Sequence, residues 1–240
     1  MTVHKSVLTK REEIAEGTMA FYFDRPPGFE FKAGQSIDLT LIDPPETDFE
    51  GDTRVFSVAS SPLDAHLMIA TRMRDTAFKR VLRKMDIGTE VAIEEPVGSF
   101  TLHLNPAKPA VLLAGGIGIT PFFSIVQHAA QGKLPHSLYL FYSNRRPEDA
   151  AFLAPLQDLE KQNPNFRFIP TMTEMPKSQR QWGGERDFIN QDTIARHLSS
   201  LQGPIYYLAG PPEMVGAMRR ILTAAGADED DIRTEEFSGY

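Results

Sequence analysis

One stretch of the sequence, residues 110–121, constrains the fold more than any other. It begins as an apolar run, AVLLA, and passes directly into GGIGITP. An unbroken apolar run of this kind indicates a strand buried on both faces, as in a parallel sheet. Gly116 and Gly118 allow a tight turn and the close approach of a ligand, and Pro121 is suited to the first position of a following helix.

This order of strand, glycine turn and helix start predicts an anion site. Free backbone N–H groups and the positive end of the helix dipole converge at such a turn, and the pyrophosphate of a dinucleotide is its natural ligand. Thr120 belongs to the same turn. The spacing Gly116-x-Gly118-x-x-Pro121 departs from the Rossmann fingerprint because proline replaces the third glycine, so a purely structural turn is the alternative.

The composition argues against several classes of function. The chain has 240 residues, no cysteine and a formal net charge of −7. Without cysteine there is no disulfide, thiolate catalysis or cysteine-bound iron–sulfur cluster, and the acidic balance argues against a nucleic-acid partner. The six histidines lack ligand spacing, so we expect no metal site. The first ten residues show no signal-peptide pattern and no apolar run could span a membrane, so we expect a cytoplasmic protein.

The chain divides into two parts with different secondary-structure patterns. Residues 1–106 contain short β-rich runs separated by proline and glycine turns, with one helix at residues 76–85, which predicts an antiparallel β-barrel domain. Residues 107–240 alternate between strands and helices, which predicts a doubly wound parallel sheet of the α/β class. A proline-containing linker, residues 105–109, joins the two domains.

The expected elements follow from these patterns. The barrel strands are expected at residues 18–23, 36–42, 54–59, 67–73 and 90–93. The strands of the second domain are expected at residues 110–114, 137–142, 166–172, 205–209 and 232–235. Its helices are expected near residues 121–131, 148–162, 190–199 and 212–225.

Four motifs, in this order along the chain, are similar to those of the ferredoxin–NADP reductase family, which includes flavodoxin and ferredoxin reductases and the reductase modules of flavohaemoglobins. RVFSVASSP at residues 54–62 is similar to the family's Arg-x-Tyr-Ser flavin motif, and the glycine turn is the second motif. AGPPEM at residues 209–214 is similar to Cys-Gly-Pro-Pro-x-Met, and EEFSGY at residues 235–240 resembles the flavohaemoglobin ends. The resemblance covers nearly the whole chain.

The resemblance implies a flavin site in the first domain. Arg54 can offer a bidentate contact to phosphate, Phe56 can stack on the isoalloxazine ring, and Ser57 can contact N5, the atom that accepts hydride. Phe56 departs from the family's usual tyrosine, so a phenolic hydrogen bond to the ribityl chain is lost. The alternative is an ordinary half-buried strand with one surface arginine.

A second phosphate-binding element is expected at the barrel-domain helix. Thr76 opens this helix, where free N–H groups could meet the flavin pyrophosphate. Thr71 and Arg72 lie in the strand before it, at a place comparable to the family's arginine-containing strand. Two such elements favour FAD over FMN. A plain helix cap is the alternative for Thr76.

The resemblance also implies a site for a nicotinamide dinucleotide in the second domain. The turn at Gly210 and Pro211, followed by Met214, lies beside the nicotinamide in the family. Ala209 replaces the family's cysteine, but the flavin carries the chemistry and the protein supplies orientation. A helix that begins at proline and binds no ligand is the alternative. The residues assigned to this coenzyme in the two turns are Gly116, Gly118, Thr120, Pro121, Gly210, Pro211 and Met214.

The C-terminal motif places further groups near the flavin. Phe237 is expected to cover the second face of the ring, and Glu235 or Glu236 to act as a proton or charge partner. With Ser57, the residues Glu235 and Phe237 form the expected catalytic set. A frayed acidic tail is the alternative.

Coenzyme preference is expected to depend on the end of the second α/β strand. Ser143, Arg145 and Arg146 lie there, and arginine accommodates the 2′-phosphate of NADPH. Glu148 and Asp149 follow closely and could instead bind the ribose of NADH, or simply start the next helix. We therefore expect NADPH, with NADH possible.

A run of basic residues stands out in an otherwise acidic chain. One interpretation is a solvated helix face; the other is a docking surface for an acidic electron carrier, since complementary charge speeds encounter. The run consists of Arg72, Arg74, Lys79, Arg80, Arg83 and Lys84.

Together these features predict a flavin-dependent NAD(P)H oxidoreductase. Hydride would pass from NAD(P)H to FAD, and electrons would pass on to a separate carrier such as a ferredoxin, a flavodoxin or an oxygenase component. We expect a monomer. Two alternatives stay open: a reductase of free flavin or other small acceptors, and a non-catalytic nucleotide-binding module that senses redox state.

Overall fold

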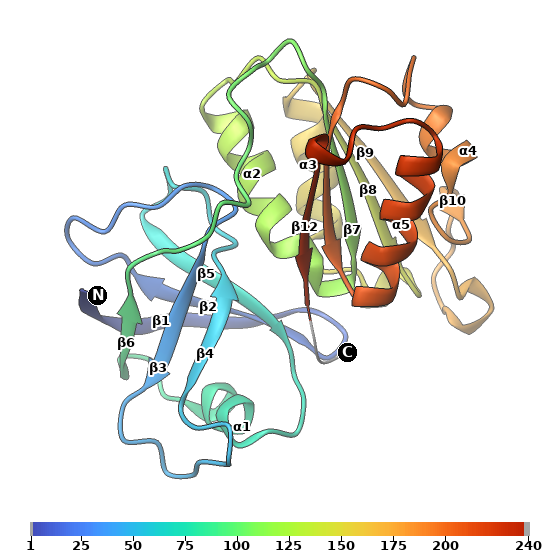
Figure 1. The fold of residues 1–240 in the computed structure, drawn as a ribbon. Helices are drawn as coiled ribbons and strands as arrows, with labels where there is room; N and C mark the ends of the chain where they lie inside the picture. The colour runs from blue at the N-terminus through green and yellow to red at the C-terminus, as the bar shows by residue number, and fades with distance from the viewer. Residues whose placement is uncertain (1, 238–240) are drawn as a thin grey trace.

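The computed structural model describes residues 2–237, which form two domains (Figure 1). The last three residues of the fourth motif, Ser238, Gly239 and Tyr240, lie outside the described residues. The first domain contains β1 (Val3–Ala15), β2 (Thr18–Asp24), β3 (Ser36–Leu41), β4 (Thr53–Ser57), β5 (His66–Arg72), α1 (Ala77–Lys84) and β6 (Glu90–Glu94).

The strands of the first domain form an antiparallel sheet that curves into a barrel, as predicted. Their order is β4-β3-β6-β1-β2-β5, and every neighbouring pair is antiparallel. Just beyond β4, the Ala59 N–H donates to the carbonyl oxygen of Met68 in β5 at 2.7 Å. The two outer strands therefore meet. Helix α1 packs Phe78, Val81 and Leu82 into the barrel core.

Strand β1 was not predicted from the sequence. Its sequence, VHKSVLTKREEIA, is rich in charge, and only Ser6 and Leu8 are fully buried. Pairing with β6 through residues 3–7 and with β2 through residues 8–15 holds it in place. Backbone hydrogen bonds on both sides, rather than an alternating apolar pattern, thus define this strand.

The second domain is a parallel sheet with helices on both faces, as predicted (Figure 1). Within residues 2–237 the strand order is β10-β9-β8-β7-β11-β12, and all pairings are parallel. The strands are β7 (Ala110–Gly115), β8 (Leu138–Asn144), β9 (Phe166–Met172), β10 (Glu185–Arg186), β11 (Ile205–Gly210) and β12 (Ile232–Glu236). The helices are α2 (Ile119–Gln131), α3 (Leu153–Gln162), α4 (Gln191–Ala195) and α5 (Pro212–Ala224).

Two buried clusters show how the helices cover this sheet. Alternate residues of β7 point to opposite faces: Leu112 packs with α2 and α3, whereas Leu113 packs with α4 and α5. Every residue of β7 and β11 is buried. Burial on both faces explains why β7 is a continuous apolar run.

Helix starts differ from the prediction at two places. A single turn of 3-10 helix at Gly116–Gly118 precedes α2, so α2 begins at Ile119 and Pro121 is its third residue. The missing N–H of Pro121 still falls in the first turn, where no intrahelical acceptor exists. Helix α3 begins at Leu153, not 148, because Phe152 adopts a left-handed conformation with φ of 59°.

The two domains meet through an apolar interface. Met68 and Phe100 belong to the same buried cluster as Phe122 and Ile125 of α2.

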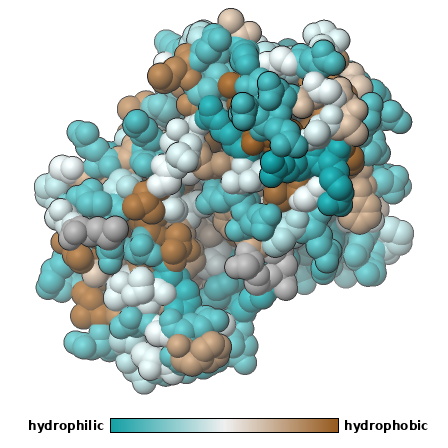
Figure 2. Space-filling model, viewed as in Figure 1, coloured by the Kyte–Doolittle hydropathy of each residue, from teal (hydrophilic) through white to brown (hydrophobic). Residues whose placement is uncertain are grey.

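Figure 2 shows a mostly hydrophilic face with scattered apolar patches. In the described part of the chain, no helix has the length and apolar character that crossing a bilayer requires.

Candidate functional site

A cleft of about 370 Å³ lies between the two domains and is lined by residues of both. All the residues predicted for the flavin from separate motifs line this one cleft. They are Arg54, Phe56, Ser57, Thr71, Arg72, Thr76 and Phe237. Thr120, from the glycine-turn motif, lines it as well.

An aromatic ring of α1 supports the barrel side of the cleft. The rings of Phe56 and Phe78 have centroids 5.9 Å apart. The Arg54 guanidinium lies 5.2 Å from the centroid of the same Phe78 ring, an arrangement that favours a cation over an aromatic face. Phe78 therefore positions both the predicted stacking residue and the predicted phosphate ligand.

Two cations of the cleft were not predicted as site residues. Arg74 and Lys79 line the cleft beside Arg54 and Arg72, although the sequence placed them in a basic run interpreted as a solvated helix face or a docking surface. The Lys79 ammonium donates to the carbonyl oxygen of Arg72 at 2.7 Å. Burial, followed by the nearby charges of Arg74 and Arg54, lowers the pKa of Lys79 to about 8. Four cations facing one cleft suit an anionic ligand.

Lys79 could have been found from its place in α1. Thr76 is the N-cap of this helix, and its hydroxyl accepts a hydrogen bond from the Lys79 N–H at 3.4 Å. The two residues therefore belong to the same first turn and face the same cleft. The structure shows the helix cap that was the alternative role of Thr76, and it also places Thr76 at the cleft.

Carboxylates of the loop before β4 bind the N-terminus of α1 and Arg54. The Asp48 carboxylate accepts the Ala77 N–H, the first of the helix, at 3.0 Å. This hydrogen bond holds the pKa of Asp48 below its ordinary value. Arg54 donates to the Glu50 carboxylate at 2.8 Å and to Asp48 at 3.4 Å.

Glu235 of β12 is a largely buried acid beside the cleft, where it lines a neighbouring pocket with Ser36 and Phe100 of the barrel domain. Its Oε2 atom is buried and has no hydrogen-bond partner among residues 2–237. Burial raises the pKa of Glu235 to about 7, against the opposing effect of the nearby Ser57 hydroxyl. Glu236 is exposed because adjacent strand residues face opposite ways. Of the two acids considered from the sequence, the structure brings Glu235 to Ser57.

The two glycine turns of the second domain pack against each other. A Cβ on Gly118 would overlap the Ala209 carbonyl oxygen, and a Cβ on Gly115 would overlap the Met214 sulfur. Gly116 has φ of 52°, a left-handed conformation that favours glycine. Close packing of β7 and β11 thus explains Gly118 without a ligand, and Met214 contacts Gly115 rather than lining the cleft.

A smaller pocket of about 220 Å³ lies at the end of β8 and is lined by Arg72, Arg145, Arg146, Asp149, Glu174 and Lys177. Arg146 is bound to Asp149 at 2.7 Å and to Glu16 at 2.8 Å. Arg145 is 70% exposed and lies 3.9 Å from Glu174. Of the two predicted arginines, Arg145 is therefore the more available to a ligand.

Asp149 and Glu148, the predicted alternatives for an NADH ribose, are both bound within the protein. Asp149 pairs with Arg146, and Glu148 accepts hydrogen bonds from the Ser178 hydroxyl and the Gln179 N–H. Ser143 lies near the end of β8 and is half-buried.

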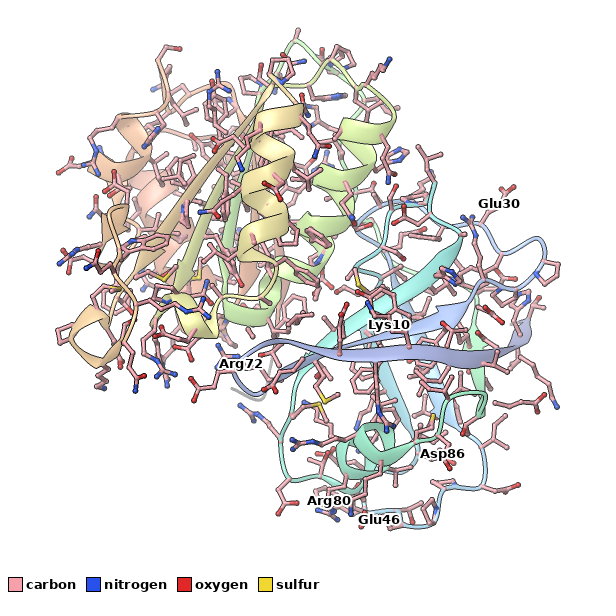
Figure 3. All side chains as sticks on the ribbon, turned by 180° about the vertical axis from the view of Figure 1, so that it is seen from behind. Lys10, Glu30, Glu46, Arg72, Arg80 and Asp86 are labelled. Carbon is pink, nitrogen blue, oxygen red and sulfur yellow. The ribbon has the colours of Figure 1, made fainter. Side chains whose placement is uncertain are left out.

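The structure divides the predicted docking surface, which runs from the end of β5 through α1. Arg72, Arg74 and Lys79 line the cleft. Arg80 is bound to Glu46 and Asp75. Figure 3 shows Arg80 beside Glu46 at the far end of the barrel domain, away from Arg72 near the domain boundary. Arg83 and Lys84 are exposed.

Residues 112–220 match the family model described as the oxidoreductase NAD-binding domain. The propane 2-monooxygenase reductase component of Mycolicibacterium smegmatis is 30% identical over 218 residues, covering 89% of this chain and 61% of that protein. The phenol hydroxylase P5 protein of Acinetobacter pittii is 30% identical over 217 residues, covering 89% and 59%. The chain spans about three fifths of the length of these curated relatives.

Solved structures share the whole two-domain fold. A ferredoxin NADP+ reductase from Neisseria gonorrhoeae, with bound FAD and NADP, superposes with a TM-score of 0.80 at 21% identity and covers 98% of both chains. The Amycolatopsis cytochrome P450 reductase GcoB gives a TM-score of 0.81 at 23% identity, covering 98% of this chain and 70% of that one.

The second domain is therefore an oxidoreductase NAD-binding domain joined to a barrel in the arrangement of two-domain reductases. The chain as a whole has the two-domain fold of a ferredoxin NADP+ reductase and is similar in sequence to reductase components of oxygenases, in line with the resemblance of its four motifs.

Proposed function

We propose that this chain is an FAD-dependent NAD(P)H oxidoreductase that passes electrons to a separate carrier. The observation that carries the proposal is the convergence of Arg54, Phe56, Ser57 and Phe237 on one cleft beside an NAD-binding domain. Relatives named as reductase components of oxygenases support it.

The residues of the cleft fit a flavin nucleotide. Arg54, Arg74 and Lys79 would hold its phosphate groups, since each presents cationic donors to the cleft. Phe56 and Phe237 would flank the ring, and Ser57 would contact N5. Beside the cleft, the buried Oε2 of Glu235 has no hydrogen-bond partner among the described residues, so it also fits a ligand with polar hydrogens. When bound, the flavin supplies the hydride acceptor and the one-electron chemistry that side chains lack.

Ser57 and Glu235 would take part in proton uptake and release at this site. Burial raises the pKa of Glu235 to about 7, and the nearby Ser57 hydroxyl acts to lower it. An acid with a pKa near the operating pH both holds and releases a proton with little cost. Oε2 of Glu235 is therefore the proposed site of proton uptake and release.

The coenzyme would bind at the carboxyl edge of the parallel sheet. Gly116 and Gly118 would place backbone N–H groups near its pyrophosphate, and Gly210 and Pro211 would lie beside the nicotinamide. NADPH is the proposed coenzyme. Arg145 supports it because, within residues 2–237, the ion pair of this exposed guanidinium is the long one to Glu174 at 3.9 Å.

The proposed acceptor is a ferredoxin, a flavodoxin or an oxygenase component. The named roles of the relatives, such as the anthranilate 1,2-dioxygenase electron transfer component of Acinetobacter baylyi, support an external electron acceptor. The proposal that the carrier is acidic rests on Arg83 and Lys84, which are exposed cations of α1. The proposal includes a monomer in the cytoplasm.

A visible spectrum tests this function. The protein is mixed with FAD, freed of unbound flavin, and treated with NADPH or NADH without oxygen. We expect a retained flavin absorption band that bleaches on coenzyme addition and returns with an artificial electron acceptor. A protein that retains no flavin at micromolar FAD, or whose flavin band does not bleach with either coenzyme, contradicts the proposal.

A further inference from the structure

The loop between β3 and β4 carries two carboxylates to the phosphate end of the cleft. Asp48 and Glu50 flank Phe49, whose side chain is 98% exposed. Glu50 and Arg54 both line the cleft. The loop therefore places negative charge where the proposed cofactor carries its own.

The Arg54 guanidinium is held by this loop. One terminal nitrogen donates to the carbonyl oxygens of Glu50, Gly51 and Thr53 at 2.9, 3.1 and 2.8 Å. The other donates to the Glu50 carboxylate at 2.8 Å and to the Asp48 carboxylate at 3.4 Å. The carbonyl contacts fix the orientation of Arg54. The carboxylates pair with the positive charge of the Arg54 guanidinium, to which a phosphate would otherwise bind.

The two carboxylates differ in how firmly they are held. Asp48 is 25% exposed, and it also accepts hydrogen bonds from the N–H groups of Ala77 and Glu50 at 3.0 and 3.1 Å. Glu50 is 48% exposed, and its carboxylate contacts Arg54 alone among the hydrogen bonds of the described residues. Glu50 can therefore leave Arg54 by a side-chain rotation, whereas Asp48 is part of the local fold.

We propose that Glu50 competes with the flavin phosphate for Arg54 and thereby sets the flavin affinity of this protein. The inference rests on the proposed function, because it requires a flavin in the cleft. A phosphate that binds Arg54 displaces the Glu50 carboxylate and must also overcome its repulsion. Arg74 and Lys79 line the same cleft, so their positive charges offset the repulsion between Glu50 and the phosphate. The charge of Glu50 also acts on Lys79.

The competition has a chemical signature that a purely structural role lacks. Only flavins that carry phosphate meet the Glu50 carboxylate at Arg54. Riboflavin has the same ring and ribityl chain without phosphate, so its affinity should not depend on this charge. Glu46 is a matched control because it forms an equivalent partly exposed pair with Arg80, 40% exposed on each side, at the far end of the domain (Figure 3).

The experiment measures dissociation constants of riboflavin, FMN and FAD by flavin fluorescence at fixed ionic strength. The proteins are the wild type, Glu50→Gln and Glu46→Gln. We expect Glu50→Gln to bind FMN and FAD about tenfold more tightly, the effect of one charge-assisted hydrogen bond. Riboflavin affinity should be unchanged, and Glu46→Gln should match the wild type with all three flavins.

The outcomes separate this inference from the proposed function. An equal gain for riboflavin would show that Glu50 only restricts access, which overturns the inference while the flavin site stands. Unchanged or weaker FMN and FAD binding in Glu50→Gln overturns it as well. If none of the three proteins binds any flavin, the proposed function and the inference fail together.

Discussion

Glu235 offers the sharpest test of how the two domains build the site. Replacing Glu235 by Gln keeps the size of the side chain and a polar oxygen near Ser57, but removes the titrating proton. Burial raises the pKa of the wild-type carboxyl from an ordinary value of 4.5 to about 7. The folded state therefore binds a proton that the unfolded chain releases between these two pH values.

The sign and size of the effect follow from proton linkage. Where the folded state holds more protons than the unfolded state, stability falls as pH rises. The contribution of Glu235 is thus fully present below pH 4.5 and is lost as pH rises to about 7. At 1.36 kcal/mol for each pH unit, this loss amounts to about 3 kcal/mol, an upper limit because the side chain keeps some contact with solvent.

Urea denaturation at pH 5 to 8 measures this difference. We expect the difference in free energy of unfolding, Glu235→Gln minus wild type, to increase as pH rises. From low pH to pH 8 this difference should increase by up to about 3 kcal/mol. Glu236→Gln, which changes the exposed neighbour, should show no such trend. If the free energies of unfolding of the wild type and Glu235→Gln changed in parallel with pH, Glu235 would not have a raised pKa.

Three other substitutions test the proposed roles. Arg54→Ala should weaken FAD binding by roughly 1.5–3 kcal/mol, because it removes a charged contact to phosphate; retention of FAD after gel filtration that equals the wild type would contradict this. Phe237→Ala should shift the flavin absorption band and change the KM for the coenzyme, and a variant unchanged in both removes Phe237 from the ring. Arg145→Ala should lower kcat/KM for NADPH about tenfold while leaving that for NADH nearly unchanged, as steady-state kinetics with an artificial acceptor can show.

The sequence predicts those elements whose identity depends on local pattern and burial. Strand β7 and helix α2 were recognised because an apolar run buried on both faces passes into a glycine turn. Helix α1 was recognised from the spacing of its buried residues, and Thr76 does cap it. These features are decided within about ten residues of chain, so sequence alone contains them.

Features decided by long-range contacts were missed. Strand β1 depends on β2 and β6 for its hydrogen bonds, and its charged sequence conceals it. The late start of α3 follows from the left-handed conformation of Phe152, a non-glycine residue that no turn signal marks. The sequence places Lys79 in a basic run with two interpretations, a solvated helix face or a docking surface, because only the packing of α1 against the barrel shows that it faces the cleft.

The contacts of β12 show why the sequence could predict the position of Glu235 but not its raised pKa. Arg233, Glu235 and Phe237 alternate along this strand and share one side, and Arg233 donates to the Thr101 carbonyl oxygen between the domains. Glu235 belongs to the α/β domain, and it lines a pocket together with Gly34, Ser36 and Phe100 of the barrel domain. Burial is the cause of the raised pKa of Glu235, so the raised pKa should be lost if the two domains separate. A titration of this carboxyl consequently reports on domain docking as well as on proton transfer.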